Sequence, residues 1–217
     1  MNKDIKIIYV YDALCGWCYG FSKVIHTFFE NHQSEFIFEV ISGGMMTGDR
    51  VGPVDKVAPF IKTAYKTVEE TTGIKFGEPY LRHLEAGVII LDSGKPAIAL
   101  SVFKTYFPEK AISFAHDLQD AIYFEGRDAT GNELYRYLAV NFGVDPDEFE
   151  AKMTQVSFKD AALYDFALAK QLEVTGYPAV LVQTGETNFY LIANGYTDID
   201  TLETRLQNVL EEIQADN

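Results

Sequence analysis

The stretch that most constrains the fold runs from residue 5 to residue 41. Residues 5–11 read IKIIYVY, an almost unbroken run of β-branched and aromatic side chains that is typical of a strand buried on both faces. A helix is predicted next, because apolar residues recur at helical spacing along one stripe: Phe21, Val24, Ile25, Phe28 and Phe29. Residues 35–41, EFIFEVI, predict a second strand. The chain is therefore expected to open as a βαβ unit.

The middle of the chain has a different pattern. Several segments between residues 54 and 173 show helical spacing and are separated by Gly or Pro, and no strand is predicted among them. After this block, PAVLVQT and NFYLIA read as two strands of a hairpin, and residues 199–213 predict a final helix that Thr197 or Asp198 can cap. We therefore expect an α/β protein with a helical domain, residues 54–173, inserted between a βαβ half, residues 1–53, and a ββα half, residues 174–217.

Charge and hydropathy exclude some classes of partner. The net charge is −14, and residues 111–217 hold 19 of the 32 acidic side chains. Nucleic acid is therefore not expected as a partner, because phosphate binding needs clustered Lys and Arg. No stretch approaches the roughly 18 to 20 apolar residues of a membrane helix, and the N-terminus lacks the features of a signal peptide. We expect a cytoplasmic protein without membrane contact.

The chain has two cysteines, and they form the motif Cys15-Gly16-Trp17-Cys18 at the predicted strand-to-helix junction. A helix N-terminus offers free N–H groups and partial positive charge, both of which favour a thiolate at Cys15. Cys18, one turn later and expected to be more buried, can resolve a mixed disulfide. A zinc site would need about four ligands, and the four histidines show no paired spacing. A redox dithiol is therefore preferred over a metal site or an inert pair.

A second feature lies far along the chain, at VTGYPAVLV. Pro178 directly precedes a predicted strand, where a proline removes no ladder donor and where an X-Pro bond can be cis. Taken alone, this pattern fits an ordinary strand start equally well. Its position after the CxxC unit and the helical block is what favours a functional interpretation.

The chain resembles the DsbA-like branch of the thioredoxin superfamily in the order of its parts: strand, CGWC at a helix start, second strand, helical block, TGYP, hairpin and final helix. The resemblance implies a thioredoxin-like fold and thiol-disulfide oxidoreductase activity, with Cys15 as nucleophile and Cys18 as resolving cysteine. It also implies that Pro178 and Tyr177 form a loop facing the cysteines, and that Gly16 and Trp17 contact the substrate. The implied partners are proteins with thiols or disulfides. No bound cofactor is expected, and glutathione is a candidate redox partner.

The sequence departs from this family in two places. Oxidising members carry a histidine within the CxxC dipeptide, whereas Gly16 and Trp17 provide no positive charge, so we expect a more reducing potential. The buried acid often found six residues before the first cysteine is replaced by Tyr9. Asp12 and Glu39 are substitutes by position for the proton relay, although each is more readily explained as a solvated or otherwise satisfied carboxylate.

Other aromatic and sulfur-containing residues near the motif have two interpretations each. Trp17 and Tyr19 could form an apolar rim for a docking peptide, while Tyr19 could equally belong to the core. Met45 and Met46, in a glycine-rich stretch, could contact the substrate or simply fill gaps.

Two other functions remain open. The same insertion architecture resembles kappa-class glutathione transferases and hydroxychromene-carboxylate isomerases, which act on small molecules, but those proteins generally have serine in the place of Cys15 and lack Cys18. A holdase with incidental thiols is the third interpretation. Neither the direction of electron transfer nor the natural substrate nor the oligomeric state follows from the sequence. A reducing cytoplasm would favour a reductase or isomerase.

Overall fold

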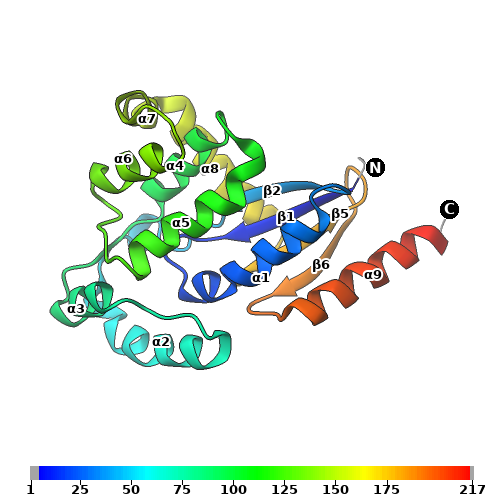
Figure 1. Ribbon diagram of the computed structural model, residues 1–217, viewed down its shortest axis with the longest axis horizontal. Coiled ribbons are helices and arrows are strands. Elements are labelled where there is room, and N and C mark those ends of the chain that lie inside the picture. Colours follow the sequence, from blue (N-terminus) through cyan, green and yellow to red (C-terminus); the bar gives the residue numbers. More distant parts are fainter. Residues whose placement is uncertain (1–4, 216–217) are drawn as a thin grey trace.

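A computed structural model describes residues 5–215, and a four-stranded mixed sheet forms its centre (Figure 1). The strand order is β2-β1-β5-β6, where the strands are β1 (Lys6–Tyr11), β2 (Ile37–Ser42), β5 (Ala179–Gln183) and β6 (Phe189–Asn194). β1 pairs parallel with β2 and antiparallel with β5, and β6 continues antiparallel. The predicted βαβ opening and C-terminal hairpin are confirmed.

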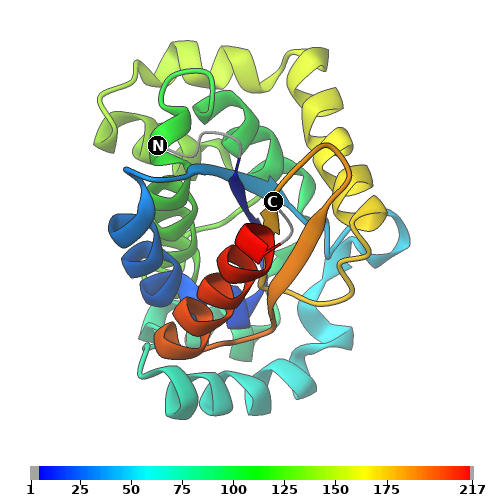
Figure 2. The same cartoon turned by 90° about the vertical axis from the view of Figure 1, so that its right-hand side faces the viewer.

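Helices cover both faces of this sheet. Alternate residues of β1 point to opposite sides: Ile7 and Tyr9 pack in the cluster that contains α1 (Gly16–His32) and α9 (Ile199–Ala215), whereas Ile8 and Val10 pack against α8 (Val156–Gln171). In Figure 2, α9 lies in front of β6, α1 is on the left and α8 on the right. Burial on both faces explains why β1 is a continuous apolar run rather than an alternating one.

Seven α-helices lie in the chain between β2 and β5. They are α2 (Ala58–Thr72), α3 (Glu78–Ala86), α4 (Gly94–Phe103), α5 (Ala111–Tyr123), α6 (Asn132–Asn141), α7 (Pro146–Met153) and α8. In Figure 1, α4 to α8 gather at the upper left, and α2 and α3 lie below them. The predicted order of elements is confirmed, while the division into two domains at residues 53/54 and 173/174 stays a prediction.

The expectation of no strand between residues 54 and 173 was wrong at one point. Ile90–Leu91 forms a short strand, β4, which pairs antiparallel with Gly52–Pro53, β3. Two residues are too few to show the alternation by which a strand is recognised in a sequence. The pairing joins the segments that precede α2 and follow α3.

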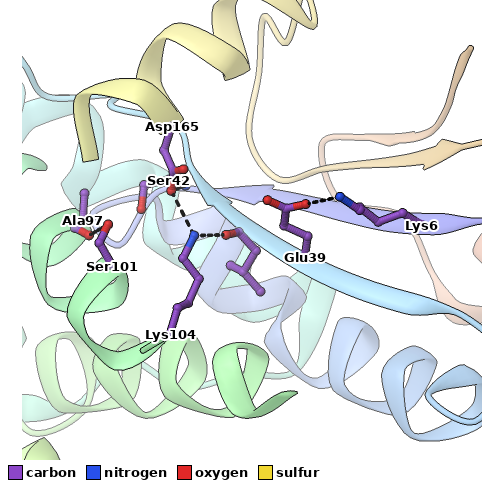
Figure 3. A network of polar contacts seen from close by, with 8 residues as sticks. Lys6, Glu39, Ser42, Ala97, Ser101, Lys104 and Asp165 are labelled. Carbon is purple, nitrogen blue, oxygen red and sulfur yellow. Dashed lines mark hydrogen bonds and ion pairs between the residues drawn. The ribbon is translucent and has the colours of Figure 1, made fainter. Parts of the chain in front are cut away.

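β2 is an edge strand, and the side chains of Lys104 and Asp165 bond two of its backbone groups (Figure 3). The ammonium of Lys104, directly after α4, donates to the carbonyl of Val40 at 3.0 Å and lies 3.4 Å from Oδ2 of Asp165 on α8. The same Oδ2 accepts from the N–H of Ser42 at 3.2 Å. Burial raises the pKa of Asp165, and Lys104 opposes that shift. The network closes an edge that could otherwise pair with another chain.

Lys104→Met should lower the free energy of unfolding by about 1–3 kcal/mol at neutral pH, because it leaves the buried carboxylate of Asp165 without its cation. Lys6→Met is the matched control. Lys6 and Glu39 also form an ion pair, at 2.8 Å, but both side chains are 36% exposed, so its loss should cost less than about 1 kcal/mol. Urea denaturation of both variants measures the difference, and equal losses would contradict a structural role for the Lys104 network.

Candidate active site

Cys15 occupies the N-cap position of α1. Its N–H donates to the carbonyl of Asp12 at 3.0 Å, which closes the turn between β1 and the helix, and its backbone is extended, as at most N-caps. The N–H of Cys18 donates to the sulfur of Cys15 at 3.3 Å. A helix-terminal N–H directed at this sulfur stabilises negative charge on it.

The two cysteines differ in burial, as predicted. Both are free thiols; Cys15 is 6% exposed and Cys18 is 0% exposed. Burial raises the pKa of the Cys18 thiol well above its usual range, and the neighbouring Cys15 adds to that shift. Cys18 is therefore protonated at neutral pH. This asymmetry suits one attacking thiol and one that acts later.

The loop before β5 reaches the sulfur of Cys15. The thiol donates to the carbonyl of Tyr177 at 3.6 Å, although 162 positions separate the two residues. The Tyr177-Pro178 peptide bond is cis, as the sequence allowed. The predicted nucleophile and the predicted proline loop are thus neighbours in space.

Gly43 fixes the position of Tyr177. The phenol of Tyr177 donates to the carbonyl of Gly43 at 2.7 Å. A Cβ atom at position 43 would lie 2.1 Å from a ring carbon of Tyr177, so the ring can occupy this place only beside a glycine. The glycine-rich stretch around Met45 and Met46 carries no local signal for this contact, which was not predicted.

Asp12 is a buried carboxylate, 1% exposed, that joins three segments around the cysteines. Its Oδ1 accepts from the N–H of Leu14 at 2.9 Å and from the hydroxyl of Ser93 at 3.0 Å, and its Oδ2 accepts from the N–H of Met45 at 2.7 Å. Burial raises the pKa of the Asp12 carboxyl, although these hydrogen bonds lower it. The Asp12 carboxylate is thus buried and satisfied by hydrogen bonds, while a part for it in the proton relay stays a prediction.

Two further residues complete the surroundings of the motif. Gln119 on α5, 1% exposed, donates to the carbonyl of Asp12 at 3.1 Å and to that of Cys15 at 3.4 Å. A polar residue on the otherwise apolar face of α5 was the available signal, and it was missed.

Tyr9 is buried near Cys18, and burial together with both cysteines raises the pKa of its phenol. Glu39 instead pairs with Lys6, away from the cysteines.

An apolar cavity of about 270 Å³ adjoins Cys15. Trp17, Met45 and Met46 contribute to its wall, so the methionines lie close to the candidate nucleophile. Trp17 is partly buried and its ring lies 6.3 Å from that of Tyr196. The suggestion that Tyr19 forms an exposed rim was wrong, since this side chain is 1% exposed and stacks on Tyr123 within the core.

Within residues 5–215, no group of three or more His, Cys, Asp or Glu side chains is placed to hold a metal ion. Across the same residues, every helix is too short or too polar to cross a membrane.

Comparison with known proteins identifies the class. The model of the family "DSBA-like thioredoxin domain" matches residues 95–207, more than half of the chain, and the chain therefore belongs to that family. The matched region begins after the two cysteines and includes the Tyr177-Pro178 loop. Among curated proteins, none matches this sequence.

Solved structures resemble the chain over nearly its whole length. A crystal structure from Nitrosomonas europaea, provisionally described as a protein disulfide isomerase, has a TM-score of 0.86 and 25% identity, covering 96% of this chain and 98% of that one. Cytosolic disulfide reductase DsbM from Pseudomonas aeruginosa has a TM-score of 0.77 and 21% identity, covering 95% and 98%. A 2-hydroxychromene-2-carboxylate isomerase has a TM-score of 0.65 and 12% identity, covering 98% and 99%. The predicted α/β thioredoxin-like fold, with helices between its βαβ and ββα halves, is confirmed.

Proposed function

We propose that this protein is a thiol-disulfide oxidoreductase that uses Cys15 and Cys18 as its redox pair. The observation that carries the proposal is the place of the Cys15 sulfur: it caps α1, accepts the N–H of Cys18 at 3.3 Å and lies 3.6 Å from the carbonyl of Tyr177. Membership of the DSBA-like family supports the same class of activity.

In the proposed reaction the thiolate of Cys15 attacks one sulfur of a substrate disulfide. A mixed disulfide forms, and the other substrate sulfur leaves as a thiolate. Cys18 then attacks the sulfur of Cys15, and its proton passes through solvent to the departing thiolate. The second substrate thiol is released, and a Cys15–Cys18 disulfide remains. The substrate gains two electrons and the protein loses two.

The neighbouring residues hold the substrate in this proposal. The backbone at Tyr177 and Pro178 faces the sulfur of Cys15 and would align the substrate chain beside it. Gly16 and Trp17 flank the nucleophile and line the adjoining cavity, where they would contact the group attached to the attacked sulfur.

We further propose that the protein acts in the reducing direction, as a cytoplasmic reductase or isomerase of thiol- and disulfide-containing proteins. Two molecules of glutathione would restore the dithiol and leave as glutathione disulfide. The absence of a positive side chain between the cysteines supports a reducing potential. A similar fold belongs to a cytosolic disulfide reductase, of which one structure contains GSH.

Equilibration in glutathione redox buffers tests this proposal. The fraction of reduced protein, measured by thiol alkylation and mass spectrometry, should follow a two-electron transition at a potential more negative than about −180 mV. A potential near that of a strong oxidant, about −120 mV, would overturn the reducing direction. Failure of the two cysteines to interconvert in any buffer would overturn the function itself.

A further inference from the structure

The cavity beside Cys15 has a lining without charge. Its walls come from α2, α3, α5 and β4, from the CxxC turn and from the loops beside these elements, and they include Trp17, Met46, Phe60, Ala64 and Phe76. Among the described residues that line it there is no Lys, Arg, His, Asp or Glu. A charged group placed there would lose its hydration without gaining a partner, whereas an apolar group would gain by leaving water.

The volume fits a group of aromatic size. An engineered apolar cavity of about 150 Å³ binds benzene, so 270 Å³ leaves room for a ring and its linker. At the mouth, the ring of Phe60 is 73% exposed, which is unusual for so large an apolar side chain. The cavity therefore has room for an apolar group, and one aromatic ring of its lining is exposed.

The sulfur of Cys15 adjoins both the cavity and the proline loop. Cys15 belongs to the lining, but Tyr177 and Pro178 do not, although the carbonyl of Tyr177 is 3.6 Å from the thiol. A disulfide held by its backbone at the loop can therefore direct a neighbouring side chain into the cavity. Glutathione, which carries carboxylate and ammonium charges, has no group of suitable chemistry for this space.

We propose that this cavity selects disulfides in which the sulfur attacked by Cys15 carries a bulky, uncharged apolar group of about aromatic size. The inference rests on the proposed thiol-disulfide exchange and specifies its substrate class. Glutathione reacts at the same sulfur in the opposite half of the cycle, with its charged ends outside the cavity.

Single-turnover kinetics with matched mixed disulfides tests the selection. The probes join 5-thio-2-nitrobenzoate to benzyl thiol, to N-acetyl-Cys-Phe-amide, to N-acetyl-Cys-Ser-amide or to glutathione. Cys15 of the pre-reduced protein attacks the disulfide sulfur that belongs to the benzyl, peptide or glutathione half of the probe. The coloured thionitrobenzoate leaves, because its thiol has the lower pKa of the two halves. Cys18 then releases the bound thiol, so no added reductant is required. Each rate is divided by the rate of the same probe with free dithiothreitol.

The benzyl probe should react at least about tenfold faster than the glutathione probe, and the Phe peptide at least about tenfold faster than the Ser peptide. If only the Phe peptide outpaces its Ser partner, peptides are the source of the apolar group. If only the benzyl probe outpaces the glutathione probe, small molecules are the source. Equal corrected rates for all four probes would overturn the inference and leave the exchange function standing. No release of nitrobenzoate from any probe would overturn the function.

Two pairs of variants link the preference to the cavity. Ala64→Phe adds a ring to the lining and should reduce the preference to about twofold or less, whereas Thr67→Phe, exposed on the same helix and absent from the lining, should retain it. Phe60→Ser removes the exposed ring at the mouth with little effect on folding, and should lower the preference about threefold. Its control is Tyr164→Ser, an aromatic residue on α8 that is 66% exposed. An unchanged preference in both Ala64→Phe and Phe60→Ser would overturn the inference.

Discussion

Cys15→Ser should reduce disulfide exchange to the rate of the uncatalysed reaction, because a serine hydroxyl does not ionise at neutral pH and Cys15 is the one thiol among the described residues that line the cavity. Cys18→Ser should instead allow the first step and stop the second. Mass spectrometry of the Cys18→Ser variant after reaction with a peptide disulfide should show a stable adduct whose mass equals protein plus one peptide thiol.

The two substitutions are matched, since each replaces one sulfur by oxygen in the same CxxC motif. Circular dichroism and thermal melting should show that both variants fold, so that any difference reports chemistry. Full exchange activity in Cys15→Ser would refute the assignment of the nucleophile. Turnover of a small electrophile with glutathione, unaffected in Cys18→Ser, would favour the glutathione-dependent transferase or isomerase. A holdase would be favoured if both variants bind unfolded protein as well as the wild type does, and if oxidation of the wild type leaves this binding unchanged.

The parts of the fold that local patterns determine were predictable. β1 is a continuous apolar run because it is buried on both faces, and α1 shows its stripe because Phe21, Ile25 and Phe28 pack against the sheet. The cysteine motif could be placed at the start of α1 for the same reason. The approach of Tyr177 to Cys15 across 162 positions was not local, and it followed from the resemblance to a family rather than from any spacing.

The surroundings of the cysteines were harder to predict, because they depend on tertiary contacts. Asp12 receives hydrogen bonds from residues 45 and 93, which come from separate elements, so its role cannot be read from the residues beside it. Gly43 is required only because the ring of Tyr177 arrives from the other end of the chain. The cavity is a space between side chains of several elements, including α2, α3 and α5, and the sequence contains no local signal for such a space.

Asp12→Ala should lower the free energy of unfolding by about 2–4 kcal/mol, measured by urea denaturation at pH 7. The change leaves three buried donors without an acceptor: the N–H groups of Leu14 and Met45 and the hydroxyl of Ser93. Each such donor costs about 1–3 kcal/mol, and removal of a buried charge offsets part of the sum. The exchange rate should fall as well, because Leu14 precedes Cys15 and Met45 lines the cavity.

Comparison with Ser93→Ala and Asp12→Asn separates the hydrogen bonds of Asp12 from its charge. Ser93→Ala leaves Oδ1 bonded to Leu14 but also removes the acceptor of the Met46 N–H, so it should cost about 1–2 kcal/mol, less than Asp12→Ala. Burial raises the pKa of Asp12 above its unfolded value of about 3.9, so the folded state holds this proton more tightly. The contribution of Asp12 to the free energy of unfolding should therefore fall as pH rises from about 3.9 through its raised pKa. Asp12→Asn cannot titrate at this position and lacks this pH dependence. The wild-type advantage over Asp12→Asn should accordingly be smaller at pH 7 than at pH 4, and the opposite trend would show that this carboxylate is stabilised in its charged form.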